Sequence, residues 1–134
     1  MIEYHCDLSR INAADLDGFF SGWPNPPTPA THLRLLRQSA HFVVAVENGS
    51  TRVVGYITAI SDGVLSAYIS QLEVLPDQRG NGIGSALVRA MLERLDGIYM
   101  VDLICDADVQ PFYEKLGLTR WTGMIRRNYA ALES

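Results

Sequence analysis

The sequence predicts a mixed α/β fold in one domain, with a central, mostly antiparallel sheet that carries helices on both faces. Two observations predict it. Three strand-like apolar segments follow one another between residues 41 and 74, separated by turn signals, as in an antiparallel meander. An amphipathic segment and a nearly all-apolar segment follow over 83–104, which indicates a right-handed crossover to a parallel strand. The length fits a single domain over residues 1–134.

The first third of the chain predicts a short strand and two helices separated by a loop. Met1–Cys6 is the strand, and Ala13–Phe20 is a short helix that turns its apolar residues toward the core. Four prolines in Ser21–Pro29 exclude a helix interior or a strand ladder, so this segment is a loop. Thr28 suits the N-cap of a second helix, Pro29–Gln38, because proline is favoured at the first helical position.

Three strands are predicted next, at His41–Glu47, Arg52–Ile60 and Leu65–Val74. Asn48-Gly49 and Asp62-Gly63 are the turn signals between them, so neighbouring strands should pair antiparallel.

The second half predicts a helix and a buried strand. Ile83–Leu95 has one apolar stripe at helical spacing, and Asp96-Gly97 ends it. Ile98–Ile104 is nearly all apolar, as expected for a strand that is covered on both faces and pairs in parallel.

The last helix is placed by its proline. Pro111 has no N–H and should lie in the first turn, so the N-cap falls no earlier than Asp108. Gly117 supplies a left-handed residue after the helix. Leu118–Trp121 and Gly123–Tyr129 are expected to be closing strands.

Composition and charge exclude several classes of protein. Apolar residues make up 48% of the chain and charged residues 19%, as in a globular protein, and no apolar run could span a membrane. The first ten residues lack the features of a secretory signal, and the two cysteines, Cys6 and Cys105, fit a reducing compartment, so we expect a cytoplasmic protein. The net charge of −4 argues against a nucleic-acid partner and suits a cationic or amine partner.

The segment between the third strand and the amphipathic helix carries the clearest signal for chemistry. A short linker after Pro76 leads into Arg79-Gly-Asn-Gly-Ile-Gly84, which opens the helix. Glycines at alternate positions let the backbone approach a ligand, and amides at a helix N-terminus favour an anion. Arg79 adds a positive charge. The combination suits a pyrophosphate.

Three further kinds of loop fit this segment less well. It could be a flexible turn that only starts a helix. A nucleoside triphosphate loop requires a Gly-Lys pair, which the chain lacks. A dinucleotide fingerprint requires glycine where Ser85 stands and a shorter linker than Pro76–Arg79, although Asp102 follows Gly82 at a fitting distance.

Two motifs together resemble the GNAT superfamily, the N-acetyltransferases that use acetyl-CoA. Val74-x-Pro76-x-x-Arg79-Gly80-x-Gly82-x-Gly84 resembles its first signature, and Pro111-Phe-Tyr-Glu-Lys-Leu-Gly-Leu118 resembles its second, in the family's order. The resemblance covers Tyr56–Leu118 well. It implies that Leu65–Val74 splays from the parallel strand Ile98–Ile104 and that the pantetheine arm of the cofactor lies in the gap.

The resemblance implies a set of cofactor contacts. Free backbone groups of the third meander strand would pair with pantetheine, and the glycine loop would hold the pyrophosphate. Asp106 stands where relatives often carry an asparagine that contacts the cofactor, so Gln110 is the nearer polar candidate, and Phe112 is a core residue or a wall of the channel. Acetyl-CoA would be a co-substrate, and the histidine and cysteine spacings predict no metal. The cofactor-binding candidates are Leu72, Val74, Arg79, Gly80, Asn81, Gly82, Ile83, Gly84, Ser85, Gln110 and Phe112.

The catalytic candidates are Tyr113 and Glu73. Tyr113 matches the family's general acid, which protonates the leaving thiolate; the alternative is a packing residue of an amphipathic helix, although Phe112 and Leu116 already fill the apolar face. Relatives often place a carboxylate near the positions of Ser70 and Gln71, where this chain has none, and Glu73 is the nearest. Glu73 acts through water or is a solvated edge residue; otherwise the amine loses its proton to bulk water. Cys105 is more typical of a buried, inert thiol than of a nucleophile.

The function expected from this resemblance is direct N-acetylation of a primary amine, on a small molecule or a peptide, in a ternary complex. The loop Ser21–Pro29, the second helix and the turn Ser61–Ser66 would form the acceptor site. A CoA-binding module without turnover is the alternative, and a nicotinamide-dependent enzyme is a weaker one. No membrane partner is expected. A homodimer paired through C-terminal strands, as in relatives, is an open possibility.

Overall fold

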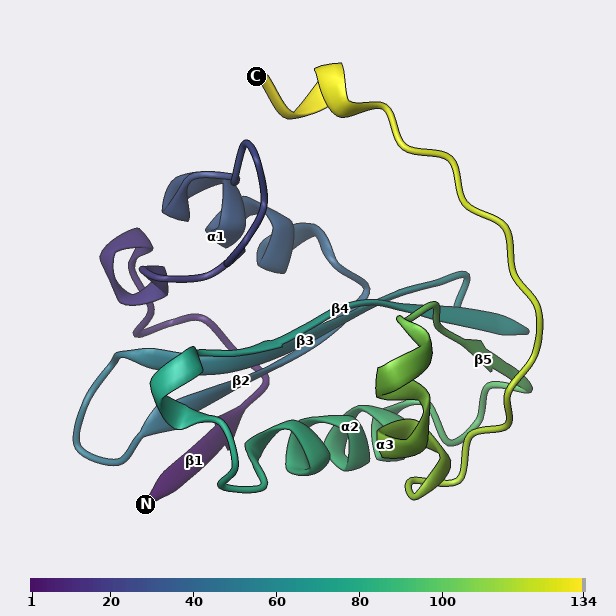
Figure 1. Cartoon of the computed structure of the whole chain (residues 1–134). Coiled ribbons are helices and arrows are strands. Elements are labelled where there is room, and N and C mark those ends of the chain that lie inside the picture. The colour runs from purple at the N-terminus through teal and green to yellow at the C-terminus, as the bar shows by residue number, and fades with distance from the viewer. Residues whose placement is uncertain (134) are drawn as a thin grey trace.

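The computed structural model describes residues 1–133 and has a five-stranded sheet in the order β1-β2-β3-β4-β5 (Figure 1). The first four strands pair antiparallel, and β5 pairs parallel to β4. The predicted meander and the parallel addition are therefore confirmed. The elements are β1 (Ile2–His5), η1 (Ala13–Leu16), α1 (Pro29–Gln38), β2 (His41–Glu47), β3 (Val53–Ser61), β4 (Ser66–Val74), η2 (Pro76–Gln78), α2 (Ile83–Arg94), β5 (Met100–Asp102), η3 (Ala107–Val109), α3 (Gln110–Glu114) and η4 (Tyr129–Glu133).

Helices cover both faces of the sheet, as predicted. In Figure 1, η1 and α1 lie on one side of the sheet, and α2 and α3 lie on the other. Gly55 on β3 brings α2 close: a Cβ at this position would stand 3.1 Å from Leu87 Cδ1 and 3.2 Å from Ile83 Cγ2. Since a side chain at this position would meet the helix, the glycine sets the spacing of the two layers. Within residues 1–133, no helix has the length and apolar content that crossing a membrane requires.

The first helix was predicted too long. Only Ala13–Leu16 is helical, as a single 3₁₀ turn, and Asp15 Oδ2 accepts the Asn12 N–H at 2.8 Å at its start. The helix cannot continue because Gly18 and Phe20 have φ of +93° and +63°, the left-handed region. Leu16 and Phe20 are nevertheless buried, as their apolar spacing indicated.

The strand predicted over Ile98–Ile104 is shorter and more exposed than expected. Only Met100–Asp102 pairs, and the Tyr99 side chain is 86% exposed. The prediction that both faces are covered is wrong, because Met100 and Asp102 on one face are exposed and only Val101 on the other face packs against the core. β5 also forms the edge of the sheet and pairs only with Ser66–Tyr68 of β4.

The start of the last helix agrees with the predicted limit. A 3₁₀ turn, Ala107–Val109, precedes α3, and the N-cap of α3 is Val109, which is no earlier than Asp108. Gly117 has the predicted left-handed conformation, with φ +96°.

The closing strands Leu118–Trp121 and Gly123–Tyr129 are wrong. Residues 118–128, here called the C-terminal arm, form no helix or strand. The arm leaves the β5 end of the sheet and crosses toward α1 (Figure 1), so its backbone has no neighbouring strand to pair with. Its Trp121 and Met124 side chains are 88% and 96% exposed.

Candidate functional site

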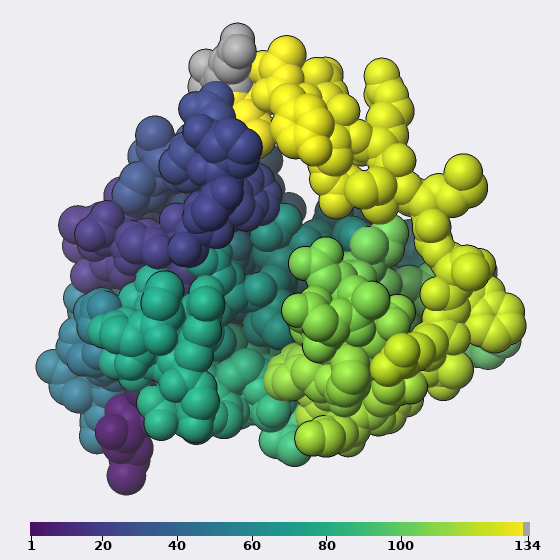
Figure 2. Space-filling view, viewed as in Figure 1, coloured from purple at the N-terminus to yellow at the C-terminus, as the bar shows by residue number. Residues whose placement is uncertain are grey.

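The central feature of the site is the parting of β4 from β5. The two strands pair only from Ser66 to Tyr68, although β4 continues to Val74. The outer edge of β4 beyond Tyr68 is therefore unpaired within residues 1–133. In Figure 2 the surface is hollowed between residues near 80 and residues near 110, where the ends of the two strands diverge. This is the splayed strand pair that the family resemblance implied.

Strand alternation decides which backbone groups face the opening. The Leu75 N–H donates to the Val54 carbonyl on β3 at 2.9 Å, so the amides of alternate residues point toward β3. Leu72 and Val74 therefore direct their N–H and C=O groups away from β3, to the free edge. The Val74 carbonyl there accepts a hydrogen bond from Arg79 Nε at 3.0 Å. Arg79 is thus anchored at the end of the opening.

The glycine loop ends at the first turn of α2. Gly82 is the N-cap of the helix and has φ +78°, and Gly80 has φ +84°. The first bond within the helix is donated by Ala86 N to the Gly82 carbonyl at 3.1 Å, which leaves the earlier amides directed out of the helix end. Gly84 lies inside α2 without a positive φ, so only two of the three glycines use that conformation.

The remaining loop residues have simple contacts. The Asn81 side-chain amide donates to the Gln78 carbonyl at 3.2 Å and closes the turn before α2. Ile83 is buried in the core, and Ser85 lies in the first turn of α2. The first turn of α2 therefore has a buried anchor and outward amides.

Phe112 joins α3 to the start of α2. A Cβ on Gly84 would lie 3.5 Å from Phe112 Cζ and 3.9 Å from Val74 Cγ2, an ordinary contact distance. Three predicted residues from β4, α2 and α3 therefore meet at one point. Phe112 lies where the three elements converge, and its role as a core residue or as a wall of the channel stays a prediction.

Tyr113 lies beside β5. It lines a groove between β5, α3 and the C-terminal arm, together with Gln110 and Cys105. Burial, and secondarily the Cys105 thiol, raise the pKa of Tyr113 to about 12, so its hydroxyl stays protonated at neutral pH. Burial also raises the pKa of the Cys105 thiol, which agrees with an inert cysteine.

Glu73 points to the opposite face of the sheet from Leu72 and Val74. Its Oε1 accepts the Phe20 N–H at 2.8 Å and its Oε2 accepts the Ser21 N–H at 3.3 Å. The carboxylate is therefore bound to the loop before α1 and is not a freely solvated edge residue. Its predicted role as a base through water stays a prediction.

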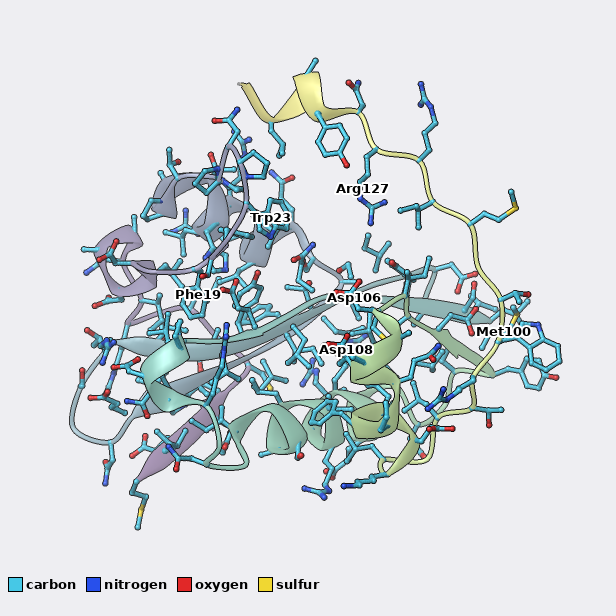
Figure 3. All side chains as sticks on the ribbon, viewed as in Figure 1. Phe19, Trp23, Met100, Asp106, Asp108 and Arg127 are labelled. Carbon is cyan, nitrogen blue, oxygen red and sulfur yellow. The ribbon has the colours of Figure 1, made fainter. Side chains whose placement is uncertain are left out.

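An aromatic cluster lies on the same face as Glu73, and sequence reasoning did not find it. His32 lies 4.3 Å from Tyr56 between ring centroids, and Phe19, Phe20 and Trp23 complete the cluster (Figure 3). The ring nitrogens of His32 and the hydroxyl of Tyr56 are buried without a hydrogen-bond partner. The i, i+4 spacing of His32 and the buried Leu36 was the sequence signal for an inward histidine.

The three expected parts of the acceptor site are not all adjacent. The loop Ser21–Pro29 and α1 are contiguous, and the Thr28 hydroxyl caps α1 by accepting the Thr31 N–H at 3.2 Å. The turn at 61–66 lies at the start of β4, at the opposite end of that strand from Glu73. The loop and α1, rather than the turn, therefore lie beside the candidate site.

Further polar groups lie at the start of the last helical segment. Asp106 is the N-cap of η3 and Asp108 lies within it (Figure 3), and the Asp106 carbonyl accepts the Val109 N–H at 3.0 Å. Among residues 1–133, no three histidine, cysteine or acidic side chains gather as metal ligands would.

Known proteins resemble this chain over most of its length. Residues 8–118 match the model of the acetyltransferase (GNAT) family. A candidate acetyltransferase from Deinococcus radiodurans R1, known as a crystal structure, is 48% identical over 96% of this chain and 90% of its own, with a TM-score of 0.93. A GNAT-family acetyltransferase from Streptococcus pneumoniae TIGR4 is 28% identical over 96% and 98% of the two chains, with a TM-score of 0.76. The Arabidopsis thaliana protein named GCN5-related N-acetyltransferase 2, chloroplastic, is 37% identical over 81% of this chain and 50% of that protein.

The buried His32 predicts a loss of stability in mild acid. Burial lowers its pKa from 6.5 to about 4, so the folded state holds the ring neutral, while the unfolded chain protonates it at higher pH. This preference for the neutral ring contributes about 3 kcal/mol to the free energy of unfolding. The contribution is fully present above pH 6.5, and it is lost as the pH falls toward 4. Urea unfolding at pH 7 and pH 4.5 measures this loss. His32→Leu should flatten the difference, whereas His5→Gln, at a partly exposed position, should leave it unchanged. An equal pH dependence in wild type and His32→Leu would contradict this prediction.

Proposed function

The chain belongs to the GNAT acetyltransferase family, and on this premise we propose that it transfers the acetyl group of acetyl-CoA directly to a primary amine in a ternary complex. The observation that carries the proposal is the free edge of β4, which leads to the outward amides at the start of α2. An extended ligand arm with a diphosphate at one end would match both features, since an unpaired strand edge binds an extended chain and a helix N-terminus binds an anion.

The donor would be held mainly by backbone groups. Leu72 and Val74 would pair with the amides of the pantetheine arm, and the segment from Arg79 to Ser85 would hold the diphosphate. Phe112 would form one wall. Gln110 lines the neighbouring groove, where it could contact the arm from the α3 side.

The transfer needs one proton donor on the enzyme. The neutral amine nitrogen attacks the thioester carbon and forms the C–N bond, and the C–S bond then breaks. The leaving thiolate takes the proton of the Tyr113 hydroxyl. The acetylated amine releases a proton to solvent, and the Tyr113 phenolate takes a proton back from solvent. A phenol that remains protonated at neutral pH suits this role, and a backbone N–H near Val74 would polarise the carbonyl.

The acceptor side would be formed by the loop before α1 and by α1 itself. The net charge of −4 favours approach of a cationic amine and disfavours nucleic acid. The acceptor is a small molecule or a peptide amine; release of CoA thiol across a panel of spermidine, 2-phenylethylamine and a lysine peptide tests the reaction and the class together.

Gly82 offers a test of donor binding. Valine at this position should be strained by φ +78° and should place a branched side chain beside the outward amides of α2. We expect Gly82→Val to raise the Kd for acetyl-CoA about tenfold or more in calorimetry. Gly49→Val is the matched control, because Gly49 has φ +81° and similar open space in a remote turn. Equal Kd values for the two variants would refute diphosphate binding at this loop.

Tyr113→Phe tests the proton donor. Loss of the hydroxyl should lower kcat by roughly 100-fold, since general acids contribute on this scale, and should leave the Kd for acetyl-CoA unchanged. Tyr4→Phe, on β1 at the opposite edge of the sheet from β5, should leave both quantities unchanged. Steady-state thiol release and calorimetry measure them. If Tyr113→Phe weakens acetyl-CoA binding as much as it slows turnover, the side chain serves packing instead.

We also propose a homodimer in which each C-terminal arm pairs with β5 of the other copy. Within the described residues, β5 has a free outer edge, and exposed Trp121 and Ile125 project from the arm. The charges favour the same pairing. The segment from Leu118 onward carries three arginines against one glutamate, a charge of +2, and the rest of the chain carries −6.

Light scattering should therefore give the mass of a dimer. Ile125→Asp on the arm should shift it toward the monomer, because a charge would enter the paired edge. Val64→Asp, at a 79% exposed position in the β3–β4 turn, is the control and should remain dimeric. A monomeric wild type would contradict the pairing.

A further inference from the structure

Glu73 links the central sheet to a loop that lies far from it in sequence. Its two carboxylate oxygens accept the backbone N–H groups of Phe20 and Ser21 at 2.8 and 3.3 Å. We propose that Glu73 is a positioning residue that holds the segment Asp17–Trp23 over β3 and β4 and so shapes the acceptor side of the site. The link to the acceptor rests on the proposed function, whereas the hold on the loop does not.

The loop needs such a hold because its backbone is strained. Gly18, Phe20 and Gly22 have φ of +93°, +63° and +84°, and Phe20 is the one residue other than glycine with positive φ in the described chain. A phenylalanine rarely adopts this conformation without bonds that compensate it. The Phe20 amide makes the shorter of the two bonds to Glu73, so the carboxylate binds the loop where the strain lies.

The held loop supplies Phe19, Phe20 and Trp23 to the aromatic cluster. The Phe20 ring lies 4.9 Å from His32 and 5.1 Å from Trp23, and the Phe19 ring lies 5.2 Å from Tyr56. Tyr56 stands opposite Glu73 in the register of β3 and β4. The Glu73 bonds therefore keep Phe20, with Trp23 packed on it, against two buried polar side chains, His32 and Tyr56, whose polar atoms have no hydrogen-bond partner.

This arrangement differs from that of a proton acceptor. A general base needs an oxygen within hydrogen-bond distance of the amine or of one intervening water. Both oxygens of Glu73 already accept loop amides, so proton transfer would compete with the bonds that hold the loop. A positioning role predicts a weaker grip on the acceptor after substitution, with the chemical step preserved. A base predicts a slower chemical step and an altered pH profile.

The experiment uses Trp23 as a reporter. The chain has two tryptophans, and Trp121→Phe leaves Trp23 alone. In this background Glu73→Gln should lose one bond, because its amide NH₂ faces an N–H, and Glu73→Asp should lose reach while it keeps the charge. We expect acrylamide quenching of Trp23 to increase about twofold in both variants. Glu93→Gln, which removes an exposed carboxylate on α2, is the control and should leave quenching unchanged.

Kinetics with the most active amine of the panel complete the test. Both Glu73 variants should raise the KM of the amine about fivefold, with kcat within about twofold and the acid limb of the pH profile in place. Their Kd for acetyl-CoA should match wild type and show that they are folded.

Unchanged quenching of Trp23 in both Glu73 variants would overturn the proposal. So would a kcat that falls about 100-fold in Glu73→Gln, with the acid limb lost and the KM unchanged, because that pattern identifies a base. If no amine is acetylated, the proposed function fails, while the quenching result still decides whether Glu73 holds the loop.

Discussion

The candidate site depends on the point at which β4 and β5 stop pairing. After Tyr68 and Asp102 the two strands separate, and β4 continues alone to Val74. An unpaired strand end inside a protein leaves amides and carbonyls that need partners. The Arg79 side chain supplies one of them, at the Val74 carbonyl. In the proposed complex, a ligand with amides of its own would pair with the remaining groups.

The same strand end serves the two faces of the sheet in different ways. Val74 turns its side chain toward α2 and Phe112, whereas its neighbour Glu73 turns toward the loop before α1. Alternation along a strand makes this division unavoidable, because successive side chains point to opposite faces. The donor and acceptor sides proposed here are therefore built from adjacent residues. A shift of one position in the register of β4 would exchange them.

The sequence patterns predicted local structure well and long-range contacts poorly. Pro29–Gln38 and His41–Glu47 have their predicted bounds, because a capping threonine and a dense apolar run act within a few residues. The Ala13–Phe20 helix was wrong, since periodicity does not reveal that Phe20 takes a left-handed conformation. The closing strands were wrong because a strand also needs a neighbour, which pattern alone cannot supply. The contact from Glu73 to Phe20 spans 53 residues, and no local signal marks it.

The close approach of α2 to the sheet at Gly55 has a consequence for selectivity. Two rigid elements, the β4 edge and the first turn of α2, stand at a separation that backbone packing fixes. In the proposed complex this separation would set the length that the acyl carrier must have between its diphosphate and its sulfur. Under this proposal, the fold would discriminate between carriers of different length, and side chains around the thioester would discriminate between acyl groups of different size.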